Sequence, residues 1–303
     1  MTRFDDLRAL SLQWSAPLTV RYGEPLRFAG RDLPGPERLR VPTRHGRVPV
    51  HLYRPPGSAD RATDPPVIVH FHGGAFVMRY PQMDDWWCRY LAATAGVAVA
   101  NVDWSVAPQA RYPVGQEEGH DVAEALATHG AEYGVDGRRL VVSGFSAGGN
   151  VAASVCLQAR DRGSFAPALQ VLGVPALDLA SEVPEDGPGM VAPGMRRLVR
   201  RVYFPDVERR CEPYASPLLA EDLSGLPPTV VLTGERDALR PDGDDYARRL
   251  RTAGVEVIHD VTPGVDHYFL TDDPVRARRT MAMVAARVAS AVGADATPSP
   301  PGG

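Results

Sequence analysis

Short runs of apolar residues, many of them β-branched, recur along the chain and alternate with longer stretches of mixed polarity. Continuous apolar runs are typical of strands buried on both faces of a parallel sheet. Strands are predicted at Val67–Phe71, Val97–Val102, Arg139–Ser143, Leu169–Val174, Thr229–Thr233 and Val255–Val261. Helices are predicted around Asp84–Ala95, Gly115–His129, Val151–Leu157, Asp242–Ala253 and Pro274–Val292. This alternation predicts an α/β fold, a mostly parallel central sheet with helices on both faces and a site at the carboxyl ends of the strands.

Two segments depart from the alternation. Residues 1–39 carry a short amphipathic helix near Asp5–Trp14, followed by proline- and glycine-rich connections. An insertion at about 180–226 is longer than an ordinary connection. We expect both segments to form a helical cap over the site; for the insertion, the alternative is a solvated surface excursion.

The remaining segments complete one domain. Residues Arg40–Thr43 and Val48–Tyr53 flank a turn and predict an antiparallel hairpin at the sheet edge, where their prolines are tolerated. Residues 294–303 hold three prolines and end in two glycines, which predicts a disordered tail. Because no internal repeat is found, the chain 1–303 is predicted to be a single domain.

Composition narrows the chemistry. The 303 residues are 44% hydrophobic and 23% charged, as in a soluble globular protein, and a net charge of -4 offers no basic surface for nucleic acid. All 33 basic residues are arginine, which excludes a Schiff-base lysine, a pyridoxal-phosphate lysine and a lysine phosphate loop. We expect no cofactor.

The compartment is also suggested by composition. Cys88, Cys156 and Cys211 are an odd number without metal-type spacing, which fits reduced thiols. Acidic residues near the N-terminus replace the apolar run of a secretory signal, and no segment is long and apolar enough to span a bilayer. A cytoplasmic protein with no membrane partner is expected; a homodimer is left open.

The segment from Val141 to Asn150 carries the strongest chemical signal. An apolar run ends at Gly144-Phe145-Ser146-Ala147-Gly148, and a helical stretch follows. This strand, turn and helix order is that of a nucleophile elbow, in which glycines on either side leave room for the chain to double back. The helix N-terminus would stabilise an anion formed beside Ser146. Ser146 is the predicted nucleophile.

A serine nucleophile needs a base, and the base needs an orienting acid. Asp237 follows the strand Thr229–Thr233, and His267 follows the strand Val255–Val261. Both should therefore lie at the same sheet edge as Ser146. Taken singly, Asp237 is typical of a helix cap and His267 of a surface loop, but together they complete a Ser-Asp-His triad.

The segment His70-Phe71-His72-Gly73-Gly74 follows an earlier strand. The backbone N–H groups of Gly73, Gly74 and Ala147 are predicted to stabilise the oxyanion of a tetrahedral intermediate. The two histidines could ligate a metal, but no further ligands accompany them, so no metal is expected.

These motifs resemble those of the hormone-sensitive-lipase-like branch of the α/β-hydrolases, a family of small bacterial carboxylesterases. The likeness covers about residues 65 to 285. His72-Gly73-Gly74-Ala75 resembles the family's His-Gly-Gly-Gly, the Ser146 segment its Gly-Asp-Ser-Ala-Gly-Gly-Asn, and Ser216-Pro217-Leu218 its Ser-Pro-Leu. The resemblance implies a helical cap, activity on short acyl esters, and Ser146, Asp237 and His267 as nucleophile, acid and base.

Some positions differ from the family pattern. Phe145 and Ala75 replace an acidic or threonine residue and a glycine, without removing a proposed N–H donor. Ser105 and Gln109 stand where the family has an arginine and a glutamate, and their joint loss would be expected if those two normally pair. These changes affect the choice of substrate more than the chemistry.

The sequence therefore predicts a serine hydrolase that cleaves a small, short-chain acyl ester through an acyl-enzyme. An acyltransferase, an amide deacylase or a lyase acting on a dedicated biosynthetic intermediate is the alternative within the same scaffold. A ligand-binding receptor is the alternative from another class, and it commonly lacks one of the three catalytic residues, which are all present here.

Overall fold

An eight-stranded sheet forms the centre of the computed structural model, which describes residues 3–21, 23–58, 63–185, 189–268, 270–271 and 273–294. The strands are β1 (Glu37–Thr43), β2 (Gly46–Tyr53), β3 (Pro66–Phe71), β4 (Ala98–Val102), β5 (Asp136–Phe145), β6 (Leu169–Gly173), β7 (Thr229–Gly234) and β8 (Val257–Thr262). Their order across the sheet is β1-β2-β4-β3-β5-β6-β7-β8. Only β2 runs antiparallel to its neighbours, β1 and β4, so the predicted edge hairpin and parallel sheet are confirmed.

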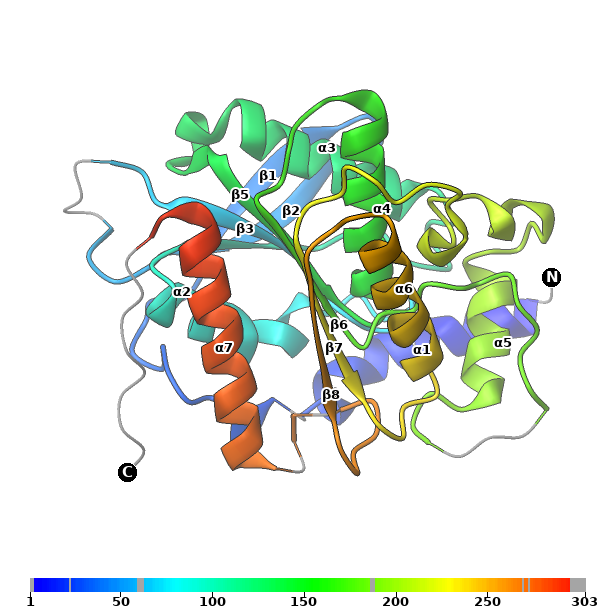
Figure 1. Ribbon diagram of the computed structural model, residues 1–303. Coiled ribbons are helices and arrows are strands. Elements are labelled where there is room, and N and C mark those ends of the chain that lie inside the picture. The colour runs from blue at the N-terminus through cyan, green and yellow to red at the C-terminus, as the bar shows by residue number, and fades with distance from the viewer. Residues whose placement is uncertain are drawn as a thin grey trace.

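Helices cover both faces of the sheet (Figure 1). They are α1 (Arg3–Thr19), α2 (Asp85–Thr94), α3 (Val114–Thr128), α4 (Ala147–Arg162), α5 (Pro193–Val202), α6 (Arg240–Thr252) and α7 (Pro274–Val292). Helices α3, α4 and α6 bury apolar side chains on one face, and α2 and α7 do so on the other. The predicted layers are thus confirmed, with differences at element boundaries: α4 begins four residues earlier than Val151 and ends five residues later than Leu157, and β5 begins three residues earlier than Arg139. None of the described helices has the length and apolarity needed to cross a bilayer.

Helix α1 is longer than the predicted Asp5–Trp14, and several of its apolar side chains are turned outward. Its residues Asp5, Ala9 and Ala16 are buried. Four large apolar side chains are 60 to 75% exposed, namely Phe4, Leu7, Trp14 and Leu18, whereas Leu12 is partly buried against the core. The carboxylate of Asp5 holds the guanidinium of Arg201 on α5, with both N to O distances at 3.0 Å. Small side chains, Leu12 and an ion pair therefore attach α1 to the protein.

The insertion after β6 contains α5, which packs beside α1 (Figure 1). Val199 and Leu198 of α5 are buried, so the insertion is more than a solvated excursion. Whether α1 and α5 act together as a cap remains a prediction. Of the predicted tail, residues 295–303 lie outside the described residues, and Ala294 packs against the core beneath α7.

The turn from β5 into α4 brings three backbone segments into close contact. A Cβ on Gly144 would lie 2.1 Å from the carbonyl oxygen of Gly148. A Cβ on Gly148 would lie 2.0 Å from the carbonyl oxygen of Phe71, the last residue of β3. Since real Cβ atoms do not approach backbone so closely, the clearance predicted for both glycines is confirmed, and it fixes α4 against the end of β3.

Replacing Gly148 tests this contact. Gly148→Ala should lower the free energy of unfolding by about 1–3 kcal/mol or more, because α4 must move away from Phe71. The measurement is urea denaturation of both proteins. Gly194→Ala is the control: Gly194 is helical and has open space around it, so its substitution should leave stability unchanged or slightly raise it. Equal stability of the two variants would contradict the proposed close packing.

Candidate active site

Three side chains that follow β5, β7 and β8 at one edge of the sheet form a hydrogen-bonded chain. Ser146 Oγ lies 2.9 Å from Nε2 of His267, and Nδ1 of the same ring lies 2.9 Å from Oδ2 of Asp237. The other carboxylate oxygen of Asp237 accepts the N–H of Leu239 at 2.9 Å. Asp237 is 4% and His267 7% exposed. The structure thus brings together the three residues predicted as a triad, and an Nδ1–H bonded to Asp237 leaves Nε2 free to accept the serine proton.

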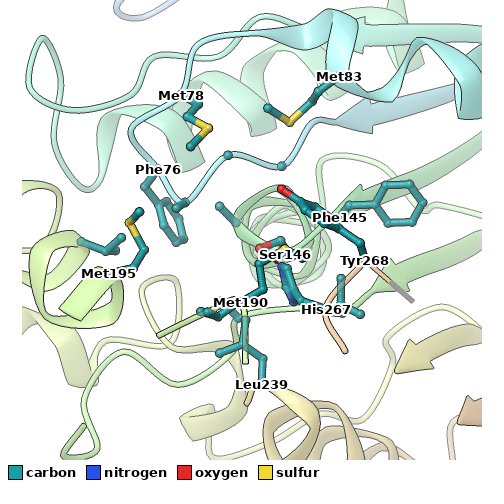
Figure 2. Close-up of a pocket in the computed structure, with 18 of the residues that line it drawn as sticks. Phe76, Met78, Met83, Phe145, Ser146, Met190, Met195, Leu239, His267 and Tyr268 are labelled. Atoms are coloured by element: carbon teal, nitrogen blue, oxygen red, sulfur yellow. Dashed lines mark hydrogen bonds between the residues drawn. The ribbon is translucent and has the colours of Figure 1, made fainter. Parts of the chain in front are cut away.

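The chain of three opens into an apolar cavity of about 290 Å³. In Figure 2, Ser146 lies at its centre, with Phe76 and Met195 on one side and Phe145 on the other. Met195 comes from α5, so the insertion supplies part of the wall.

Backbone strain is concentrated around this cavity. Within the described residues, four non-glycine residues have positive φ, and all four line the cavity: Ala75 (52°), Phe76 (57°), Ser146 (54°) and Val174 (42°). Such conformations cost of order 1 kcal/mol each and persist where surrounding contacts enforce them, most often at functional sites. At Ser146 the strain is that of the elbow, where ψ is -116°.

The predicted oxyanion donors are not equivalent. The N–H of Gly73 donates to Oδ2 of Asp84 at 3.2 Å, so this donor is already occupied. In the described part of the chain, the N–H groups of Gly74 and Ala147 have no acceptor, and neither does that of Ala75. All of these residues line the cavity beside Ser146. The sequence analysis noted Ala75 only as a replacement for a glycine, whereas its free N–H makes it a further candidate donor.

Buried polar side chains hold the Gly73 peptide on both sides. Asp84 Oδ2 also lies 3.1 Å from Nε2 of His70, whose Nδ1 lies 2.7 Å from Ser143 Oγ on β5. Nδ1 of His72 lies 2.7 Å from the carbonyl oxygen of Gly73, and burial lowers the pKa of His72, which keeps the ring neutral. These side chains are at most 1% exposed. No local pattern points to Asp84, because its role arises from a loop folding back onto β3.

Phe145 forms one wall of the cavity. Its ring is stacked on Trp86, with 5.8 Å between centroids, and meets Trp87 edge-on at 4.9 Å. A Cβ on Gly173 would lie 2.0 Å from the Phe145 ring. The ring thus occupies space that a side chain on β6 would take, so the replacement before the nucleophile makes this side of the cavity aromatic.

The two other departures from the family pattern have separate partners. The N–H and Oγ of Ser105 donate to the carboxylate of Glu118 at 2.8 and 2.9 Å. The amide of Gln109 pairs reciprocally with that of Gln13 on α1. Ser105 and Gln109 are therefore each bonded to another residue, and they do not pair with each other.

Asp242 on α6 is a buried carboxyl group that holds the loop after β6. Its Oδ2 accepts the N–H groups of Leu177 and Asp178 at 2.8 and 3.0 Å. Burial raises the pKa of Asp242 to about 7, although the two hydrogen bonds act to lower it. Asp178 also lines the cavity, so Asp242 holds the backbone of one residue of the cavity wall.

One group in the described residues has metal-type ligands: His120, Asp121 and Glu124. Both oxygens of Asp121 are bound by Arg44. His70 and His72 are engaged as described above. We therefore assign no metal or cofactor to any of these residues.

Comparisons with known proteins give the family. A family model described as alpha/beta hydrolase fold matches residues 68–271. Ethyl acetate hydrolase of Pseudomonas putida is 35% identical over 238 residues, which cover 77% of this chain and 74% of that protein. An arylesterase of Saccharolobus solfataricus is 31% identical over 265 residues, covering 82% of this chain and 81% of that one. An esterase structure from Pyrobaculum calidifontis superposes with a TM-score of 0.81 at 31% identity and covers 95% of each chain.

The chain belongs to the α/β-hydrolase family. Within that family it is a carboxylic ester hydrolase, as the resemblance in the sequence predicted.

Replacing Asp84 tests whether its hydrogen bond to Gly73 supports the proposed oxyanion loop. Asp84→Ala should lower kcat for a simple ester by about 10- to 100-fold, because the Gly73 peptide loses the acceptor that fixes it. KM should change much less. Steady-state kinetics with p-nitrophenyl acetate would measure both.

Asp85→Ala is the matched control for Asp84. Asp85 binds Tyr53 and Arg89 and does not contact the oxyanion loop, so its loss should reduce stability and leave kcat nearly unchanged. If both variants lost kcat equally, the loop argument would be wrong.

Asp242 gives a prediction for stability against pH. A carboxyl group whose pKa is higher in the folded protein stabilises it fully below about pH 4 and loses that contribution as the pH rises through 7. Compared with Asp242→Asn, the wild type should lose up to about 1.4 kcal/mol of unfolding free energy per pH unit between about pH 5 and 7. Urea denaturation across this range measures the difference, and parallel curves for the two proteins would refute the assignment.

Proposed function

We propose that Ser146, His267 and Asp237 catalyse the hydrolysis of a small acyl ester in two steps. Ser146 Oγ attacks the ester carbonyl while His267 Nε2 takes its proton, and the tetrahedral oxyanion collapses as His267 returns the proton to the leaving alcohol. Water, deprotonated by His267, then attacks the acyl-enzyme; the serine recovers its proton and the acid is released. Asp237 orients the imidazole and stabilises its charged form.

The observation that carries this proposal is the unbroken hydrogen-bonded chain from Ser146 through His267 to Asp237, beside free backbone donors. We propose Gly74, Ala147 and Ala75 as the oxyanion donors. The N–H of Gly73, already bound to Asp84, then acts in positioning the loop. Asp237 and His267 are nearly buried, so charge developing at the serine is poorly screened by water and these interactions are strong.

Cavity size supports a short acyl group. A volume of about 290 Å³ is at the lower end of ligand pockets, which span roughly 300–1,000 Å³. The walls contributed by Phe76, Phe145 and Met195 leave an apolar space next to Ser146 that suits a small acyl chain. Acyl transfer to a dedicated acceptor, amide deacylation and lyase chemistry stay alternatives, and no specific contact favours them. The receptor alternative has no support from a site in which all three side chains are aligned.

Location and assembly stay predictions. Cys88 and Cys156 are buried and Cys211 is exposed, all without a disulfide, which is in keeping with a cytoplasmic enzyme. We also propose a homodimer, which a measurement of molecular mass in solution would test.

The triad is tested by ester hydrolysis. Ser146→Ala should reduce kcat for p-nitrophenyl acetate by at least about 10³-fold, and His267→Ala by a comparable factor, since triad members act as a unit. Activity should fall as the acyl chain of the ester lengthens. Fluorophosphonate should label the wild type and leave Ser146→Ala unlabelled.

Ser154→Ala is the control for replacing a serine near the site, because Ser154 is buried on α4 and bonded to Gln158 away from the cavity. It should keep full activity. Labelling without turnover of any simple ester, together with release of the acyl-enzyme by an added amine or alcohol, would favour acyl transfer. A wild type that neither labels nor hydrolyses esters would refute the triad.

A further inference from the structure

One face of α5 adds positively charged groups to a mainly apolar cavity wall. Met195, Arg196, Val199 and Arg200 all line the cavity, and their spacing places them on one side of the helix. Figure 2 shows Met195 across from Phe145, on the opposite side of Ser146. The arginines therefore lie in the half of the cavity formed by the insertion.

The guanidinium of Arg200 is hydrogen-bonded to backbone carbonyl groups. Its Nε donates to the carbonyl of Leu179 at 2.7 Å, and its Nη2 donates to the carbonyls of Ser181 at 2.7 Å and Asp178 at 3.3 Å. The side chain is buried, and burial together with the nearby charge of Arg196 lowers the pKa of Arg200 to about 10, so it keeps its charge at neutral pH. Arg200 thus adds a fixed positive charge beside Arg196.

Arg196 has no such commitment. Across the described ranges, its guanidinium forms neither a hydrogen bond nor an ion pair with a protein group, although the side chain is only partly exposed. Arg197 and Arg201, its exposed neighbours on α5, both have partners: Arg197 donates to the carbonyl of Pro184, and Arg201 binds Asp5. Arg196 thus lines the cavity without a bonded partner among the described residues, so a ligand could reach it.

The two carboxyl groups nearby are already bonded. Asp178 accepts the N–H groups of Ala180 and Ser181 and the hydroxyl of Ser181. Asp242 accepts two backbone N–H groups and has its pKa raised to about 7, so it carries only part of a negative charge. Neither lies within ion-pair distance of Arg196 among the described contacts, although the charge of Arg196 acts to lower the pKa of Asp242. The Arg196 guanidinium is thus left without a directly bonded carboxylate among the described residues of this cavity wall.

We infer that Arg196 binds a carboxylate on the ester that Ser146 hydrolyses, and that the natural substrate is the ester of a small acidic molecule. The inference rests on the proposed function. A planar guanidinium matches the two oxygens of a carboxylate, and the limited volume and apolar walls favour a single carboxylate over a larger, more hydrated dianion. Partial burial strengthens the contact, because water competes less for both groups.

The test compares esters that differ only in a carboxylate or a carboxamide. On the acyl side the pair is mono-p-nitrophenyl adipate and the corresponding adipamate; on the leaving-group side it is p-acetoxybenzoate and p-acetoxybenzamide. Arg196→Gln should lower the ratio of kcat/KM for carboxylate over carboxamide by about 10-fold or more in at least one pair, which also shows the side on which the carboxylate lies. Arg196→Glu should lower it further. Intrinsic reactivity cancels, because each ratio is compared between wild type and variant.

Arg197→Gln is the matched control, since it removes the same charge one residue away and outside the cavity. Its ratio should stay within about twofold of the wild type, and hydrolysis of the neutral p-nitrophenyl acetate by the wild type reports the basal activity. If Ser146-dependent hydrolysis of that ester is intact but Arg196→Gln changes neither ratio, the inference is overturned and the proposed function stands. If Arg197→Gln lowered the carboxylate-to-carboxamide ratio equally, the effect would be one of overall charge, and the inference would also be overturned. If the wild type hydrolyses no ester, the proposed function fails first.

Discussion

The proposed catalytic geometry depends on how closely α4 approaches the end of β3. Gly148 lies against the carbonyl of Phe71 with no room for a side chain, and β3 and β5 are paired in parallel with Phe71 beside Gly144. Ser146 follows the last residue of β5, and the loop that carries the proposed oxyanion donors follows the last residue of β3. One close backbone contact therefore sets the distance between Ser146 and the N–H groups that we propose as oxyanion donors.

Around this contact, buried polar groups hold the loop after β3, which is not held by the sheet itself. A loop after β3 has no sheet hydrogen bonds of its own, so its peptides need other partners. The N–H of Gly73 is bound by Asp84 and its carbonyl by His72, while His70 joins Asp84 to Ser143 on β5. Because these groups are buried, losing one partner would leave another unsatisfied, which makes the loop rigid. The free donors of Gly74 and Ala75 are thereby held in fixed directions beside Ser146.

The outer part of the cavity is built differently. Helix α5 faces the cavity through long, flexible side chains such as Met195 and Arg196. Helix α1 is attached by Asp5, Leu12 and small residues, while several of its large apolar side chains face outward. A sheet edge with rigid backbone donors suits the chemistry that all members of a class share. A wall of side chains from an insertion can change without disturbing that edge, so we assign the choice of ester to α5 and the reaction to the strands.

The sequence by itself determined the parallel sheet, the elbow and the identity of the three side chains that meet there. Apolar runs of strand length and paired glycines have few other structural solutions, and residues that follow parallel strands must share one edge. Tertiary structure alone decided that Gly73 is bound by Asp84, that Ser105 and Gln109 have separate partners, and that α1 buries Asp5 and exposes Trp14. Each of these depends on which distant segment fills the space beside a residue. The spacing of residues along the chain does not predict which distant segment this is, because contacts between loops are fixed by packing and not by periodicity.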